Sequence, residues 1–291
     1  MYKKMVCMVL AFIFAVSVWY AYAEIIKDNK ERRYEESQYF DNPIVEGASK
    51  VGQWKNAPNT EIQDPKNYLL FFDDFTVFDV SATANGDIWL ASRSMTNVLD
   101  SAPGGQINFY SGDMDTDLHQ NMQVNGESFQ VQKDKPMYFE ARMTPSFVGT
   151  QPGFFVGLAT TDTNIIGGAG GGTGATTMLG FRSGVSDTAS IYADIRSNSN
   201  EYLVDTGVDQ SSSTAVRLGF SVDNSVSTGI AMYVNDNLVS RPCTSGRCTM
   251  FLDSSLPIYV TPTFEFMPNA NAVWRGGPSI KLDYIKAIQK R

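Results

Sequence analysis

Three alternate carboxylates are the first side chains whose type and spacing could do chemistry. They are Asp113, Asp115 and Asp117, and hard oxygen ligands of this kind bind calcium. The run begins like an EF-hand loop, but Leu118 stands at the sixth position, where that loop needs glycine, and Val124 stands at the twelfth, where it needs glutamate. An EF-hand is therefore excluded. A solvated acidic turn and a calcium site completed by other loops both stay open, and we expect no other cofactor.

The cysteines of the C-terminal half, Cys243 and Cys248, enclose a short Thr-Ser-Gly-Arg turn. A tetrahedral metal site would need four ligands, and the single histidine of the chain, His119, is far away in sequence. Two thiols this close across a turn suit a disulfide in an oxidising compartment. We therefore predict a Cys243–Cys248 disulfide, with two free thiols as the alternative.

The other reactive side chains lack the surroundings that catalysis needs. The glycine-rich segment 167–174 has no following Lys-Ser/Thr pair and opens no helix, which favours a surface loop over a phosphate-binding loop. His119 has no neighbouring cysteine and no hydroxyl nucleophile in a recognisable elbow. We therefore predict that the protein is not an enzyme and has no catalytic residue.

Glycan binding would need an exposed aromatic side chain with amide or acid groups around it. One stretch offers both, because Asn269 and Asn271 come shortly before Trp274, and these three residues are the tentative glycan contact. The other aromatic candidates are Trp54, Trp89 and Tyr202. Aromatic side chains in a sandwich more often lie in its core, so this interpretation competes with a structural one.

The N-terminus has the pattern of a secretory signal peptide. Two lysines precede an uncharged run over residues 5–23, which ends in Ala21-Tyr22-Ala23, the small-x-small pattern of signal peptidase sites. The run is at the short end of the ~17–25 residues that span a bilayer, so a signal peptide cleaved after Ala23 is favoured over a retained membrane anchor. Residues 24–68 are expected to form a charged, proline-containing arm, and residues 69–291 one domain.

The charge balance limits the partners. The chain carries 31 acidic and 23 basic residues, a formal charge of −8, and loss of residues 1–23 would remove two lysines and bring it to −10. A protein with this net negative charge is repelled by the phosphate backbone of nucleic acids and by anionic lipid. We expect no nucleic acid partner, and membrane contact only through residues 5–23 if they are retained.

From residue 69 onward the chain has short strands between Gly, Asn, Asp and Ser turns, and no stretch keeps a helical period. Fourteen strands without a helix imply an all-β sandwich of two packed antiparallel sheets. The predicted strands are 69–78, 87–90, 106–110, 129–132, 137–143, 154–159, 178–182, 189–196, 202–204, 215–222, 229–234, 238–241, 258–266 and 279–288.

Several local patterns predict which strands pair and which side chains share a face of a sheet. Segments 137–143 and 154–159 are expected to pair with each other in one sheet, with Glu140 and Arg142 meeting opposite charges beside them or across it. Residues 231–239 predict a hairpin with a tight Asn/Asp turn. Two strands alternate between faces. In them Ile191, Ala193 and Ile195 oppose Tyr192, Asp194 and Arg196, and Ile280, Leu282 and Tyr284 oppose Lys281, Asp283 and Ile285.

The order and spacing of several short segments resemble a known group. These segments are Phe71-Phe72-Asp73-Asp74-Phe75, Tyr138–Arg142, Phe154-Phe155-Val156-Gly157-Leu158 with Thr160-Thr161-Asp162, Leu218-Gly219-Phe220, Tyr233-Val234-Asn235 and Leu282-Asp283-Tyr284-Ile285. The chain from about residue 69 resembles the concanavalin A-like jelly-roll proteins among the structural proteins of tailed phages. The resemblance implies a non-enzymatic decoration or fibre-type subunit on a virion surface, in a fold widely used for glycan binding, whose N-terminal arm would contact neighbouring capsid or particle proteins.

The same broad fold includes secreted β-glucanases, whose catalytic strand has a Glu-x-Asp-x-x-Glu pattern with alternate carboxylates facing the groove. That pattern does not occur here. The nearest analogue is Asp194, which is expected to stand alone on its face between Tyr192 and Arg196. A glycoside hydrolase is therefore the third hypothesis, after the virion protein and a secreted carbohydrate-binding lectin, which the signal peptide would suit.

Overall fold

The computed structural model describes residues 68–75, 80–81, 88–92, 98–100, 105–110, 120–126, 129–132, 135–147, 151–162, 165, 177–184, 189–197, 200–222, 229–240, 258–267 and 278–291. These residues form strands, turns and bends, without a helix. Within them, accordingly, no helix has the length and apolar character to cross a membrane. The two N-terminal segments that we expect, 1–23 and 24–68, lie outside the described residues, except for Tyr68, with which β1 begins, whereas we predicted the domain to begin at residue 69.

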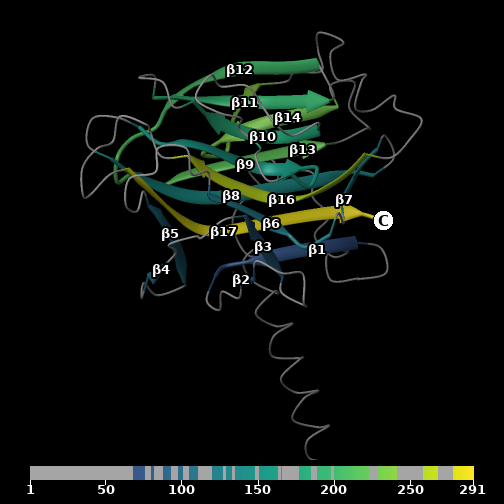
Figure 1. Ribbon diagram of the computed structural model, residues 1–291. Coiled ribbons are helices and arrows are strands. Elements are labelled where there is room, and N and C mark those ends of the chain that lie inside the picture. The colour runs from purple at the N-terminus through teal and green to yellow at the C-terminus, as the bar shows by residue number, and fades with distance from the viewer. Residues whose placement is uncertain are drawn as a thin grey trace, which may run out of the picture. The chain divides into compact units, whose positions relative to one another are not determined.

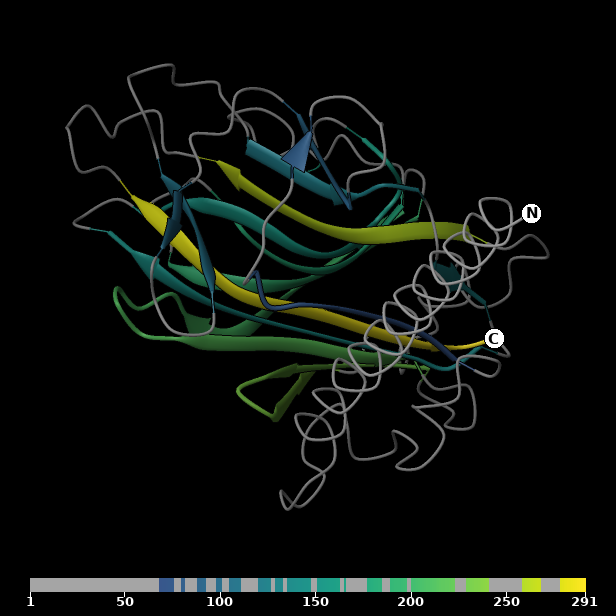
Figure 2. The same ribbon diagram turned by 90° about the horizontal axis from the view of Figure 1, so that it is seen from below.

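The strands form two sheets, which lie as curved layers in Figures 1 and 2. Sheet A has the order β15-β14-β13-β8-β17-β5-β4, with β1 also beside β17, and sheet B has the order β12-β11-β10-β9-β16-β6-β3-β2, with β7 also beside β16. The bounds are β1 Tyr68–Asp73, β2 Val80–Ser81, β3 Trp89–Ser92, β4 Val98–Asp100, β5 Gln106–Tyr110, β6 Gln120–Val124, β7 Phe129–Val131, β8 Met137–Ser146, β9 Gly153–Ala159, β10 Thr177–Ser183, β11 Ser190–Ser197, β12 Asn200–Asp209, β13 Val216–Val222, β14 Ile230–Val234, β15 Asn237–Ser240, β16 Ile258–Met267 and β17 Ser279–Lys290.

The prediction of an all-β sandwich of two antiparallel sheets is confirmed, although the short β2 runs parallel to β3. Each of the fourteen predicted strands overlaps an observed one, and β2, β4 and β6 were not predicted. The β6 sequence, Gln-Asn-Met-Gln-Val, gives little apolar alternation. It is nevertheless buried, because Met122 faces the core while Asn121 and Gln123 are covered on the opposite face.

Aromatic side chains from both sheets fill the core. Phe109 of β5 in sheet A and Phe264 of β16 in sheet B are fully buried, with ring centroids 4.5 Å apart. Within sheet A, Phe139 and Phe220 stack at 5.0 Å. Burial of one such ring stabilises the fold by about 2 kcal/mol, so the alternation of apolar residues along these strands is enough to fix which face turns inward.

The predicted pairing of segments 137–143 and 154–159 is wrong. The first segment is in β8, which pairs with β13 and β17 of sheet A, whereas the second is in β9, which pairs with β10 and β16 of sheet B. The chain between them crosses from one layer to the other. Alternation could not distinguish these arrangements, because strands that face each other across a core show the same pattern as strands that pair side by side.

The charges of β8 do find opposite charges across the sheet, as predicted. Lys286 Nζ lies 3.3 Å from Glu140 Oε1, and the Tyr284 hydroxyl donates to the same oxygen at 2.6 Å. Arg142 donates to Asp283 Oδ2 at 2.7 Å. All three partners belong to β17, which pairs with β8.

The predicted alternation of the closing strand holds only for its first half. The register between β17 and β8 shifts between Leu282 and Tyr284, as in a β-bulge. Ile280 and Leu282 face the core as expected, but beyond the shift Ile285 is buried and Tyr284 turns to the outer face. The sequence gives no sign of this bulge, since the parts of the strand before and after it each alternate regularly.

The Asn/Asp hairpin is confirmed as β14 and β15. Its two turn residues, Asn235 and Asp236, have φ values of 49° and 66°, the left-handed conformation that a two-residue turn requires. The Asn235 side chain also accepts the main-chain N–H of Arg217 at 2.9 Å, which anchors the turn to β13.

Candidate ligand-binding site

Most of the predicted site residues stay predictions, because they lie outside the described residues. These are the cleavage site with Ala21 and Ala23, the acidic run 113–117, His119, the glycine-rich segment 167–174, the cysteines Cys243 and Cys248, and the glycan contact Asn269, Asn271 and Trp274. Among the described residues, no three His, Cys, Asp or Glu side chains are grouped so that they could hold a metal ion.

The two aromatic candidates that are described belong to the core, as the structural interpretation predicted. Trp89 is almost completely buried, and its indole Nε1 donates to Asp73 Oδ2 at 2.6 Å. Burial raises the pKa of Asp73, and the hydrogen bond from Trp89 partly offsets that rise. Tyr202 is half-buried against the core cluster. Neither side chain offers a platform to a ligand.

Sheet B carries a group of charged side chains on its outer face, and Asp194 is at its centre. Ile191, Ala193 and Ile195 of β11 face the core as predicted, so that Asp194 and its flanking Tyr192 and Arg196 turn outward. Asp194 is fully buried all the same. A carboxylate in this position must be held by groups from neighbouring strands, because a buried charge without partners is costly.

Asp194 does not stand alone, contrary to the sequence interpretation. Arg182 of β10 places Nε 2.9 Å from Asp194 Oδ2 and its NH2 nitrogen 3.0 Å from Glu201 Oε1 of β12, so one guanidinium bridges two carboxylates. Neither oxygen of Asp194 accepts a hydrogen bond of good geometry, although the ion pair is close. Burial therefore outweighs the attraction of Arg182 and raises the pKa of Asp194 to about 7.

The middle of the same outer face is closed over an apolar cluster. The buried ring of Phe155 lies against Gly157 of β9 and Gly180 of β10, where a Cβ atom would come within 3.0 Å and 3.1 Å of ring carbons. Four further buried side chains belong to the same apolar cluster as Phe155, and they are Ala159, Ile165, Met178 and Met267. Because these side chains are buried, no open surface for a ligand remains there.

Buried polar side chains hold the segment after β9 over this cluster. Asn121 Nδ2 donates to the Asp162 carbonyl and Gln123 Oε1 accepts the Asp162 N–H, both at 2.8 Å. Glu265 Oε2 accepts the N–H of Ile165 at 2.5 Å. The polar residues of β6 and β16 thus satisfy main-chain groups, which is a structural role.

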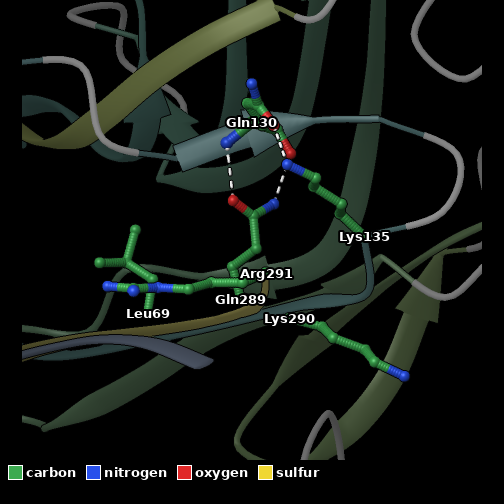
Figure 3. Close-up of a pocket in the computed structure, with 6 residues that line it drawn as sticks. All are labelled: Leu69, Gln130, Lys135, Gln289, Lys290 and Arg291. Atoms are coloured by element: carbon green, nitrogen blue, oxygen red, sulfur yellow. Dashed lines mark hydrogen bonds between the residues drawn. The ribbon is translucent and has the colours of Figure 1, made fainter. Parts of the chain in front are cut away.

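An open cavity of about 390 Å³ lies elsewhere, between β7 and the ends of β1 and β17. Figure 3 shows the six residues that line it, which are Leu69, Gln130, Lys135, Gln289, Lys290 and Arg291. A volume of this size is in the range of small-ligand sites, and polar groups outnumber apolar ones among the lining side chains. We take this cavity, the Gln130 pocket, as the candidate ligand-binding site.

One wall of the Gln130 pocket is formed by the side chain of Gln289, whose amide group hydrogen-bonds the main chain of β7 as a neighbouring strand would. Gln289, only 3% exposed, comes from β17 of sheet A, and its Oε1 accepts the main-chain N–H of Gln130 in β7 at 2.7 Å. Its Nε2 donates in return to the Gln130 carbonyl. The main-chain N–H of Lys290 donates to the Pro136 carbonyl at 2.9 Å, which fixes the segment that carries Lys135. The pocket is therefore preformed.

An exposed aromatic residue is the strand partner of one of the residues that line this pocket. Tyr259 of β16 is 45% exposed, and it is the register partner of Gln130 in β7. Since the main-chain groups of Gln130 bond Gln289, the two residues form a non-hydrogen-bonded pair, the kind whose side chains approach most closely. Tyr259 is also the one aromatic among the exposed large hydrophobic side chains of the described residues.

Sequence reasoning did not find this site. Gln130 and Gln289 are separated by 159 positions, and they lie in different sheets. Glutamine and lysine are ordinary surface residues, so no motif marks them. The single available signal was Tyr259, an aromatic residue at an outward position of a strand whose neighbours Ile258 and Val260 face inward.

Comparison with protein-family models and with curated proteins finds no match. Among solved structures, the chain is similar to arcelin-5, a lectin-like defence protein from Phaseolus vulgaris, with a TM-score of 0.48 and 8% identity over 77% of this chain and 99% of arcelin-5. It is also similar to lectin UEA-II, solved with galactose, with a TM-score of 0.48 and 10% identity over 77% and 100% of the two chains.

A third similar structure is a carbohydrate esterase from the Shiga toxin-encoding bacteriophage phi24B, with a TM-score of 0.40 and 9% identity over 71% of this chain and 92% of the esterase. With TM-scores below 0.5 these similarities do not bear on ligand or activity. The resemblance to structural proteins of tailed phages stays a prediction.

Proposed function

We propose that the protein is a non-catalytic glycan-binding β-sandwich whose binding site is the Gln130 pocket with Tyr259 beside it. The observation that carries this proposal is the position of Tyr259, an exposed aromatic residue paired across two strands with Gln130, which lines a polar cavity. Sugars stack their apolar faces on aromatic rings, while fixed amide and charged groups hydrogen-bond their hydroxyls.

The arrangement of the polar groups supports binding rather than catalysis. Hydrolysis of a glycoside by the usual mechanism needs two carboxyl groups that flank the bond, and among the residues that the structure describes no Asp or Glu lines the Gln130 pocket. The carboxylates that do lie together, Asp194 and Glu201, are bridged by Arg182. One guanidinium therefore already pairs with both of these carboxylates.

Binding of the full chain to an array of immobilised glycans tests the proposal. We expect wild type to bind at least one glycan class, and Tyr259→Ala to bind it about tenfold more weakly without a change in melting temperature, because one stacking surface is lost. The matched control is Leu203→Ala, which truncates another exposed side chain, on β12 of sheet B. It is expected to bind like wild type.

Two outcomes would contradict the proposal. The first is that wild type binds no glycan on the array. The second is that Tyr259→Ala binds as strongly as Leu203→Ala, which would place the binding surface elsewhere. The role on a virion surface, with the arm 24–68 as the contact to neighbouring proteins, stays a separate prediction that deletion of this arm tests by loss of incorporation into particles.

A further inference from the structure

We propose that the Gln130 pocket recognises an anionic substituent, a carboxylate or a sulfate group, and that the glycans bound are therefore acidic. This inference rests on the proposed function and narrows its ligand class. It follows from three properties of the pocket: which hydrogen-bonding groups are already used, which charges line the cavity, and how these charges differ from the rest of the molecule.

The glutamine oxygens of the pocket already accept hydrogen bonds from within the protein. Lys135 Nζ can only donate, and it donates to Gln130 Oε1, which fixes the orientation of that amide. The side-chain oxygen of Gln289 accepts the Gln130 N–H, and the Gln130 carbonyl accepts from Gln289 Nε2. Three of the four oxygens of these two glutamines thus each accept one hydrogen bond within the protein, and each keeps one lone pair.

The donors of the pocket have more hydrogen-bonding capacity left for a ligand than its oxygens do. The Gln130 amide nitrogen keeps both of its hydrogens, the Lys135 ammonium keeps two of its three, and Arg291 contributes a guanidinium group to the lining. A neutral sugar presents hydroxyls that both donate and accept, and its donors would meet oxygens that already accept one hydrogen bond each. A carboxylate or sulfate only accepts, and it matches a set of donors.

The charges of the lining residues favour the same class. Lys135, Lys290 and Arg291 line the pocket, and no Asp or Glu of the described part of the chain does. Within the described residues these three side chains form no ion pair, whereas Arg142, Arg182, Arg217 and Lys286 each contact a carboxylate. In Figure 3 the Lys290 and Arg291 side chains both point away from the two glutamines, so the direct contact would come from Lys135, with Lys290 and Arg291 adding charge at longer range.

The pocket is a positive site on a negative protein. The whole chain has a formal charge of −8, which repels polyanions with closely spaced phosphates. A single anionic group on an otherwise neutral glycan avoids most of this repulsion, and Tyr259 beside Gln130 gives its sugar ring an apolar surface. Charge and shape together favour an acidic glycan over nucleic acid.

Pairs of glycans that differ only in charge test the inference with the full chain. Each pair is a uronate-containing oligosaccharide with its methyl ester, or a sulfated oligosaccharide with its desulfated form. We expect the charged member of a pair to bind at least tenfold more tightly than the neutral member. Lys135→Met should remove most of this difference, whereas Lys281→Met, which removes the same charge near the other end of β17, should keep it.

The outcomes separate this inference from the proposed function. Equal binding of the neutral and charged members would overturn the anionic preference and leave glycan binding intact. Absence of binding to every glycan would overturn both. Complete displacement of the glycan by inorganic sulfate at equal concentration would show that the pocket holds a free anion, and the glycan assignment would fall. If Lys135→Met unfolds, charge reversal by Arg291→Glu is expected to abolish the difference instead.

Discussion

Two polar regions of the sandwich differ in how their charges are used. On the outer face of sheet B, Arg182 contacts both Asp194 and Glu201, and the cluster around Phe155 is buried. In the Gln130 pocket, Lys135 contacts a neutral amide and the cavity is open. The charge of a cation that pairs with two carboxylates is neutralised within the protein, whereas a cation that contacts a neutral amide oxygen keeps its charge for a ligand. The pocket is therefore the region where substitution should change binding, and the outer face is the region where it should change stability.

The largest effect is expected from Gly157→Ala on the closed face. A Cβ atom there would stand 2.3 Å from the main-chain oxygen of Leu179 and 2.6 Å from the Cα of Gly180, so paired strands would have to separate. We expect a loss of about 3 kcal/mol or more in the free energy of unfolding, measured by urea titration. Gly126→Ala is the control, because nothing lies within 4 Å of its Cβ and only its positive φ adds a cost of about 1 kcal/mol. Equal stability of the two variants would show that the sheets are looser than described.

A pH-dependent effect is expected from Asp194→Asn in the same region. The folded carboxyl has a pKa of about 7 against a model-peptide value of 3.8, so between these values the folded chain binds one proton more than the unfolded chain. Stability should therefore fall as pH rises from about 4 to about 7, and stay level above that. Asn cannot ionise, so the variant should be about 1–3 kcal/mol more stable than wild type at pH 8 and nearly equal at pH 4.

Urea unfolding at several pH values measures this difference. The control is Asp205→Asn, which removes an exposed carboxylate from β12, and its pH profile should follow that of wild type. Parallel profiles for wild type and Asp194→Asn would mean that Asp194 stays ionised in the folded chain, and the contrast between the two regions would lose its electrostatic basis.

A smaller effect on stability is expected from Gln289→Leu in the pocket. The substitution removes the two hydrogen bonds to the main chain of Gln130, which costs about 1–2 kcal/mol, and leaves the rest of β17 in place. Glycan binding should nevertheless fall at least tenfold, because Gln130 loses its fixed position. Unchanged binding would show that the pocket is not where the glycan contacts the protein. Gln120→Leu, at another buried glutamine that bonds a main-chain carbonyl, should keep full binding.

Sequence could predict the architecture because burial and alternation act locally. The strand ranges, the inward face of β11 and the Asn235-Asp236 turn all follow from side chains within a few residues of one another. The pairing of β8 with β9 could not be decided in this way, and it was predicted wrongly, since paired and facing strands share one pattern. Strand β6 was missed because its polar residues are buried by a segment 41 positions away along the chain, as the bond from Asn121 to Asp162 shows.

The site was harder to predict than the fold for the same reason. The expected partnerless carboxylate, Asp194, has partners from two other strands, and the pocket joins residues of β1, β7 and β17. The ligand class that we propose for the pocket depends on which glutamine oxygens already accept hydrogen bonds. Only the three-dimensional arrangement determines this. Of the residues involved, Tyr259 alone had an outward position that alternation could have indicated.

The measurement that tests the central claim most directly is a nuclear magnetic resonance titration of the isotope-labelled full chain with a sulfated tetrasaccharide. The account predicts that shifted signals gather at the side-chain amides of Gln130 and Gln289 and at Tyr259, while those of Asp194 and Leu203 stay in place. Shifts centred on the outer face of sheet B, with the Gln130 and Gln289 amides unmoved, would contradict it.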